Sequence, residues 1–311
     1  MLKLNWVFYI LCFLSISCGK EIELQKDPEL VSDLKSETTI EDEVGTAVDL
    51  NLDIYVRENC TGAPGQCYTS LSSVDGNIVG DTALTSKNLT SQDANITIHI
   101  DQAWTAVDAN PVEFSGWITD ASHHLTIQTE GAARHNGNRN TVGVYILDPS
   151  VAGVALKLGV TYNDSDTRYT HVDGLIIQGT ESDQSHGIEI NGLGGRIDNT
   201  LVLDIADHTL GRETYGIIAQ APNFDLTITN TVVSGSNGRG VGLSCWVPSG
   251  CTANGSGTVK IYNSIITANN TGLVTWGGDD WTGVNLEVVN TYINSGSGDA
   301  DIQQFFHGGL N

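Results

Sequence analysis

Basic side chains are scarce in this chain of 311 residues. Its 14 lysines and arginines face 37 aspartates and glutamates, which gives a formal net charge of −23. A body this acidic is a poor partner for nucleic acid or for an anionic bilayer surface, so both are excluded as partners. It would also repel acidic polysaccharides unless cations bridged the contact.

The apolar run near the N-terminus, from Leu4 to Ile16, is too short to span a bilayer as a helix. After Lys3 it is typical of a secretory signal peptide, which we assign to residues 1–17. Leu14 to Cys18 resembles the bacterial lipobox, with Ser15 in the slot usually held by Leu, and an ordinary cleaved signal is the alternative. We expect an extracytoplasmic protein, held at the bacterial outer membrane or cell surface through a lipid on Cys18, or else secreted.

The six cysteines include no pair with the CxxC spacing of a zinc ligand set. Cys60 and Cys67 lie seven residues apart, and Cys245 and Cys251 lie six apart. Two local disulfides fit the oxidising compartment that the signal peptide indicates, and we favour them over a metal site.

Residues 18–48 lack aromatic side chains and apolar periodicity, and they predict an acidic, flexible tether. We expect residues 49–139 to form an N-terminal cap and the first strands, with a capping segment at Tyr68–Ser73. Residues 140–311 then hold the repeats.

Four segments repeat one pattern, in which Asn and then Ser or Thr stand between apolar positions. Asn recurs at 199, 230, 263 and 290, at intervals of 31, 33 and 27 residues, and an earlier copy has Gly174 in the same slot. Self-similarity of this kind is the signature of a solenoid. Asparagines aligned in the bends are expected to hydrogen-bond up and down the stack.

A second motif alternates with the first: a polar residue, then Gly, then a short strand with a period of two. Its copies begin at His186, Tyr215, Arg239 and Thr271. The glycine is expected to mark a tight bend before each strand. One turn would then hold a strand, an Asn bend, a second strand, a loop and the Gly-led strand, paired in parallel with the next turn. An antiparallel sandwich with Asn-rich turns is the alternative, but this repeated order does not suit hairpins.

These segments resemble the repeats of the right-handed parallel β-helix, or pectin-lyase-like, superfamily, over about residues 140 to 306. The resemblance implies an all-β solenoid with an N-terminal cap, and a groove over the outward side of one strand column. It is specific for the fold and not for an activity. If the Gly-led strands are that column, its outward positions are Glu189, Ile218, Gly242, Val274 and, further upstream, Tyr145.

Three residues just before the glycines are candidates for catalysis: His186, Tyr215 and Arg239. A polysaccharide lyase needs a base for the proton alpha to a uronate carboxylate, and these are suitable residue types. A corner position also tolerates any polar residue. The segment at His186 is similar to a strand of polygalacturonases, but no upstream Asn-Thr-Asp and no downstream Arg or Lys accompanies it, so glycoside hydrolysis is disfavoured.

The loops after the later Gly-led strands are rich in tryptophan and aspartate. Tryptophan faces stack on sugar rings and aspartates accept hydroxyl hydrogen bonds, which would make a carbohydrate platform. Tryptophans that only cover the edge of the stack are the alternative. The expected substrate-binding residues are Glu189, Trp246, Trp276, Asp279, Asp280 and Trp281.

An oxygen-rich loop with Asn163, Asp164 and Asp166 has the ligand types that Ca²⁺ prefers, although an ordinary turn has the same composition. Calcium is the one cofactor we consider. The leading hypothesis is a monomer that binds extracellular polysaccharide, with a uronate lyase and a structural surface stalk as the alternatives.

Overall fold

The computed structural model describes residues 50–151, 153–159, 169–179, 184–192, 194–206, 214–220, 224–244, 256–276, 283–296 and 302–305. The predicted signal peptide, the lipidation site Cys18 and the tether lie outside the described residues.

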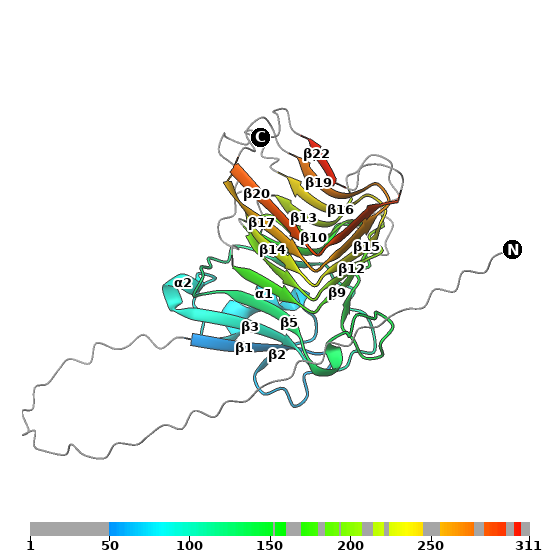
Figure 1. Ribbon diagram of the computed structural model, residues 1–311. Helices are drawn as coiled ribbons and strands as arrows, with labels where there is room; N and C mark the ends of the chain where they lie inside the picture. The colour runs from blue at the N-terminus through cyan, green and yellow to red at the C-terminus, as the bar shows by residue number, and fades with distance from the viewer. Residues whose placement is uncertain are drawn as a thin grey trace, which may run out of the picture. The chain divides into compact units, whose positions relative to one another are not determined.

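The described residues form three parallel sheets, which we call A, B and C (Figure 1). Sheet A runs in the order β2 (Gln66–Tyr68), β1 (Leu50–Val56), β3 (Ala94–Ile100), β5 (Leu125–Thr129), β8 (Thr170–Asp173), β11 (Gly194–Asp198), β14 (Phe224–Thr229), β17 (Ser256–Tyr262) and β20 (Gly283–Val289). Sheet B runs in the order β22 (Ile302–Phe305), β19 (Thr271–Trp276), β16 (Arg239–Ser244), β13 (Tyr215–Gln220), β10 (Gln184–Ile190), β7 (Gly153–Leu158) and β4 (Val112–Phe114). Sheet C runs in the order β21 (Tyr292–Ser295), β18 (Ile265–Ala268), β15 (Val232–Ser236), β12 (Leu201–Leu203), β9 (Ile176–Gln178) and β6 (Ile146–Leu147).

The chain visits the sheets in the order A, C, B and then returns to A one turn higher. β11, for example, leads through Asn199 into β12 of sheet C, and a longer connection leads to β13 of sheet B. Strands of successive turns pair in parallel, as β11 does with β14 and β12 with β15. The parallel β-helix predicted from the repeats is therefore confirmed, and the antiparallel sandwich is wrong.

The asparagine corners lie between sheets A and C. Asn199, Asn230, Asn263 and Asn290 all have φ near +50°, a left-handed conformation that asparagine tolerates better than most residues. Asn290 Nδ2 donates to Asn263 Oδ1 at 3.3 Å, and each corner's backbone N–H from Asn199 to Asn263 bonds the next turn. The predicted file of asparagines is confirmed, and it holds successive turns in register.

The glycines that begin the sheet B strands have a different role from the predicted bend. Gly187, Gly216 and Gly240 do not adopt positive φ. A Cβ added at Gly187 would lie 2.5 Å from Cγ1 of Val202 in sheet C, and those at Gly216 and Gly240 would meet Val233 and Ile266. Glycine is required there because the start of each strand packs directly against the inner side chains of sheet C.

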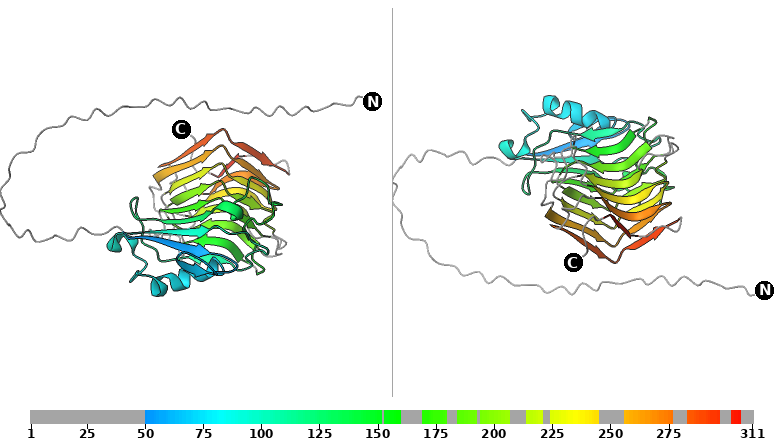
Figure 2. Two further views of the ribbon diagram at one scale, coloured as in Figure 1. Left: turned by 90° about the horizontal axis from the view of Figure 1, so that it is seen from below. Right: turned by 90° about the horizontal axis from the view of Figure 1, so that it is seen from above.

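The inward side chains of the three sheets form one apolar core. In β3 the residues alternate strictly between buried and half-buried, because successive side chains of a strand point to opposite faces. Helix α1 (Ser72–Asp81) covers the first turns with the fully buried Val74 and Ile78, and the short helices α2 (Leu89–Gln92) and η1 (Gly131–Ala133) lie in neighbouring loops. Figure 2 shows α1 and α2 at the end of the stack opposite the last strands.

Of the two predicted disulfides, Cys60–Cys67 is present, with 5.6 Å between the Cα atoms. It closes the loop between β1 and β2. Cys245 and Cys251 lie outside the described residues.

Candidate functional site

The structure brings the three candidate catalytic residues together at the start of the sheet B strands. His186, Tyr215, Arg239 and Thr271 pair in register across β10, β13, β16 and β19. Arg239 Nη1 donates to the Tyr215 hydroxyl at 2.8 Å, and its guanidinium lies 5.4 Å from the centre of the tyrosine ring. The His186 ring lies 5.4 Å from the same ring on the other side. The predicted stacking is confirmed, whereas a catalytic role for these residues stays a prediction.

The outward column of sheet B is closed and apolar rather than an open groove. Tyr215 is only 1% exposed, and it packs with the buried Ile218 and Val274 in a cluster separate from the main core. A Cβ added at Gly242 would collide with the Tyr215 ring. A groove was expected here only if these strands were the binding column, and the burial of these side chains counts against that choice.

Of two other residues of the expected groove, Tyr145 differs from the prediction and Glu189 agrees with it. Tyr145 lies outside sheet B, just before β6 of sheet C, and it is fully buried in the main core, where its hydroxyl donates to Asp108 Oδ2 at 3.0 Å. Burial beside Asp108 raises the pKa of Tyr145 well above its ordinary value. Glu189 does face outward, but its Oε1 accepts a 2.5 Å hydrogen bond from Asn191.

Most of the predicted loop residues cannot be placed. Trp276 ends β19, and only its backbone is described. The others lie outside the described residues: the platform residues Trp246, Asp279, Asp280 and Trp281, and the calcium loop with Asn163, Asp164 and Asp166.

The polar side chains that the sequence reasoning missed lie on the outward face of sheet A. Two rows cross its strands in register. The first row is Thr97, Thr126, His171, Arg196, Thr227, Lys260 and Glu287. The second row is His99, Gln128, Asp173, Asp198, Thr229, Tyr262 and Val289. From β8 onward, the first row lies three positions before the Asn or Gly corner of each turn, and the second row lies one position before it. That constant spacing is the sequence signal that could have identified both rows.

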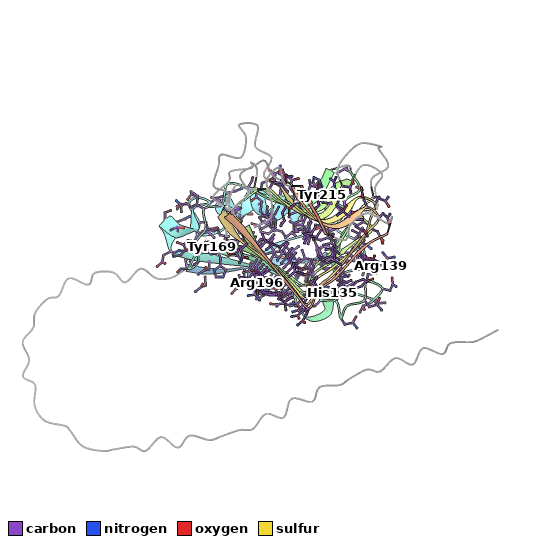
Figure 3. The ribbon with its side chains drawn as sticks, turned by 45° about the horizontal axis from the view of Figure 1, so that its top comes forward. His135, Arg139, Tyr169, Arg196 and Tyr215 are labelled. Carbon is purple, nitrogen blue, oxygen red and sulfur yellow. A yellow bond between two sulfur atoms is a disulfide. The ribbon has the colours of Figure 1, made fainter. Side chains whose placement is uncertain are left out.

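A pocket of about 350 Å³ opens between the first row and the loops beside it. This volume falls in the range of small-molecule sites. Its polar and aromatic lining consists of His124, Tyr169, Thr170, His171, Arg196, Asp225 and Thr227. In Figure 3, Tyr169 and Arg196 lie along one side of the coil, and Tyr215 lies on another.

Asp198 does not line the pocket, but it holds two residues that do. It is almost fully buried, and its Oδ2 accepts a 2.8 Å hydrogen bond from His171 Nε2 and forms an ion pair with Arg196. The Arg196 side chain is nevertheless 59% exposed, so its remaining N–H groups face solvent. Among the described residues, Asp198 Oδ1 has no hydrogen-bond partner. The carboxylate therefore holds two side chains of the pocket lining in place before any ligand binds.

A second charged group lies at the corner between sheets A and C. Arg134 makes two hydrogen bonds of 2.8 Å to the carboxylate of Asp173, and Asn199 Nδ2 donates to the same carboxylate at 2.7 Å. Although burial acts the other way, these hydrogen bonds lower the pKa of Asp173. Beside them, burial lowers the pKa of His135, and Arg139 pairs with Asp204 (Figure 3). Every carboxylate here is occupied, so this group stabilises the corner.

The described residues contain neither a metal-binding cluster nor a membrane-spanning helix. No group of three or more His, Cys, Asp or Glu side chains is arranged to hold a metal ion. No helix there is long and apolar enough to cross a membrane.

The comparisons with known proteins name no relative: no family model, no curated protein and no solved structure matches the chain. The fold is that of a parallel β-helix protein.

Proposed function

We propose that this protein binds extracellular polysaccharide, and that the pocket on sheet A holds one sugar unit of the chain. The carrying observation is the pair of polar side chains, Arg196 and His171, that the buried Asp198 holds in the lining of an open pocket. Sugar hydroxyls both donate and accept hydrogen bonds, and the lining offers both roles. Arg196 donates, the exposed Asp225 accepts, and Tyr169 adds an aromatic side chain to the lining.

The compartment and the family are part of the same proposal. The repeat corners support membership of the pectin-lyase-like superfamily, and the N-terminal signal supports export with a lipid on Cys18. An extracellular polysaccharide is the class of ligand that such a protein would meet. The disulfide Cys60–Cys67 fits an oxidising compartment.

A binding screen of the purified protein tests the proposal. Soluble neutral and uronate polysaccharides are measured by biolayer interferometry, first against the wild type and then against Arg196→Ala. Loss of hydrogen bonds from a charged group is expected to weaken binding about tenfold or more. Lys260→Ala is the matched control, because Lys260 stands in the same row but does not line the pocket.

Two results would count against the pocket. If Arg196→Ala and Lys260→Ala bind like the wild type, the ligand lies elsewhere. If no polysaccharide binds, the structural stalk becomes the better reading of the molecule.

A uronate lyase is the second candidate, and the observation that favours it is the hydrogen bond from Arg239 to the Tyr215 hydroxyl. Tyrosine and arginine are among the residue types that can supply the base for the proton alpha to a uronate carboxylate. The burial of Tyr215 is the argument against it, because a base must reach its substrate. The test is absorbance from unsaturated products, with and without Ca²⁺. Product that disappears in Arg239→Ala would support the lyase.

A further inference from the structure

A file of apolar side chains crosses the outward face of sheet C. In each strand the first residue pairs with its equivalents in the neighbouring turns. We call this file the apolar ladder, and it consists of Ile146, Ile176, Leu201, Val232, Ile265 and Tyr292. The second residue of each apolar pair, such as Val202 or Val233, belongs to the core, so the core does not explain why the first is apolar.

The chain itself covers the lower half of the ladder. Val144 packs against Ile176 and Leu201, both of which are buried. The ion pair between Arg139 and Asp204 ties the loop that carries Val144 to the end of β12. Packing within the molecule therefore accounts for these rungs.

Among the described residues, the last two rungs have no such cover. Ile265 is 46% exposed and Tyr292 is 59% exposed, although both continue the same file. Beside them runs a row of small polar side chains, in which Thr267 Oγ1 donates to Ser234 Oγ at 2.9 Å and Asn294 pairs with Thr267 in register. Two exposed apolar side chains that are adjacent on neighbouring turns make this face a candidate binding surface.

Asparagines border this surface on both sides. Asn290 bonds Asn263 at 3.3 Å along one edge, and Asn269 Nδ2 donates to Asn237 Oδ1 at 2.9 Å along the other. Hydrogen bonds between turns keep both borders regular. The surface is therefore an apolar ladder beside a hydroxyl and amide row, framed by amides.

The absence of charge decides what this surface fits. Residues 230–238, 263–276 and 290–296 contain no Asp, Glu, Lys, Arg or His, in a chain with 37 acidic residues. An ionic polymer would find no counter-charge here. An uncharged pyranose chain offers C–H faces to the ladder and hydroxyls to the amide and hydroxyl side chains. The rungs stand about 4.8 Å apart, which is comparable with the repeat of sugar rings in an extended chain.

We propose that the outward face of β15, β18 and β21 is a second binding site, which takes an uncharged polysaccharide chain lying across the strands. The site goes beyond the pocket on sheet A, since it uses another sheet and needs no charged residue. Tyr292, the last rung, stacks on a sugar ring at one end of the site. The two sites can succeed or fail separately.

The test measures binding of three neutral probes, hydroxyethyl cellulose, galactomannan and dextran, by affinity gel electrophoresis of the purified protein. The wild type is expected to bind at least one of them, with little change when salt rises from about 0.05 to about 0.5 M, because no ion pair contributes. Ile265→Asp and Tyr292→Ala are each expected to weaken that binding about tenfold. Both side chains are exposed, and circular dichroism during thermal unfolding checks that the variants fold.

Val151→Asp is the matched control, since Val151 is 50% exposed and lies outside sheet C. The proposal is overturned if the wild type binds no neutral probe, or if both variants bind as it does. Sedimentation velocity provides a further test: a dimer that Ile265→Asp dissociates would overturn it in favour of self-association. Binding that Arg196→Ala abolishes and Ile265→Asp preserves would support the sheet A pocket alone.

Discussion

Arg134 occupies the space above Gly174 that an asparagine side chain fills in the later turns. A Cβ added at Gly174 would lie 2.8 Å from Nη1 and 3.0 Å from Cζ of Arg134, and 2.5 Å from Oγ1 of Thr129. The first clear corner of the repeat thus has glycine in the asparagine slot because a loop arginine has taken its place. The asparagine file ends there on Asp173, which Arg134 and Asn199 both bond.

Gly174→Asn is therefore expected to destabilise the protein by about 1–3 kcal/mol, although asparagine tolerates positive φ. In an Arg134→Ala background the same substitution should be less damaging, because part of the space is vacated. Urea unfolding of the two single variants and the double variant measures the coupling. Strict additivity would contradict the steric account.

Alanine in place of glycine should act in opposite directions in the two parts of the fold. Gly216→Ala forces a methyl group against Val233 in the core, and we expect a loss of about 1–3 kcal/mol. Gly80→Ala, in helix α1, meets no atom within 4 Å and should add about 0.5–1 kcal/mol. Chemical unfolding measures both changes. A stable Gly216→Ala protein would show that the two sheets separate more easily than the packing indicates.

Two histidines should give opposite pH dependences of stability. His123 Nε2 bonds Asp93 Oδ1 at 2.9 Å and Nδ1 bonds Asp120 Oδ1 at 2.7 Å, and the bond to Asp93 contributes most to raising the pKa of His123. The protonated ring therefore stabilises the folded state fully below the pKa of an unfolded histidine, about 6.5. This stabilisation is lost as the pH rises through the higher pKa of the folded state. Burial lowers the pKa of His135, so its contribution is present above about 6.5 and is lost as the pH falls.

Unfolding midpoints of His123→Gln and His135→Gln, measured between about pH 5.5 and 8, check this pair. His123→Gln should be less stable than the wild type at low pH, and this difference in stability should shrink as the pH rises. For His135→Gln the difference in stability should shrink as the pH falls. Parallel curves for the two variants would contradict the assignment.

Removing the disulfide is expected to lower the free energy of unfolding by about 2 kcal/mol, because Cys60 and Cys67 close a short loop. The double variant Cys60→Ser with Cys67→Ser isolates this effect, since a single substitution leaves a reactive thiol. Urea unfolding with and without reductant is the measurement. Reductant should destabilise the wild type and have no such effect on the double variant.

The architecture was accessible from the sequence because its corners have narrow conformational requirements. Few residues other than glycine and asparagine readily adopt φ near +50°. The asparagines at 199, 230, 263 and 290 can therefore be recognised as corner residues from the sequence alone. The glycines of sheet B were predicted to form bends, but glycine is required there for another reason. A side chain at these positions would collide with Val202, Val233 or Ile266 of sheet C, and a contact between two sheets cannot be recognised from the local sequence.

The candidate site was harder to predict because its chemistry comes from variable positions. His171 and Arg196 occupy equivalent places in adjacent turns, but the residues at the same place further on are Thr227, Lys260 and Glu287. Only the structure shows that Asp198 contacts both of the first two side chains. Arg134 lies in a loop outside the repeats, and only the folded chain brings its side chain next to the corner at Gly174.

Each asparagine corner forms hydrogen bonds with the turns directly next to it. One turn of the coil can therefore be added or removed as a unit. A gene that gains or loses one such unit keeps every remaining corner satisfied. The connections that follow the sheet B strands differ in length from turn to turn, whereas those before β16 and β19 have only two residues. Lineages of this molecule could thus vary in height and in loop content independently.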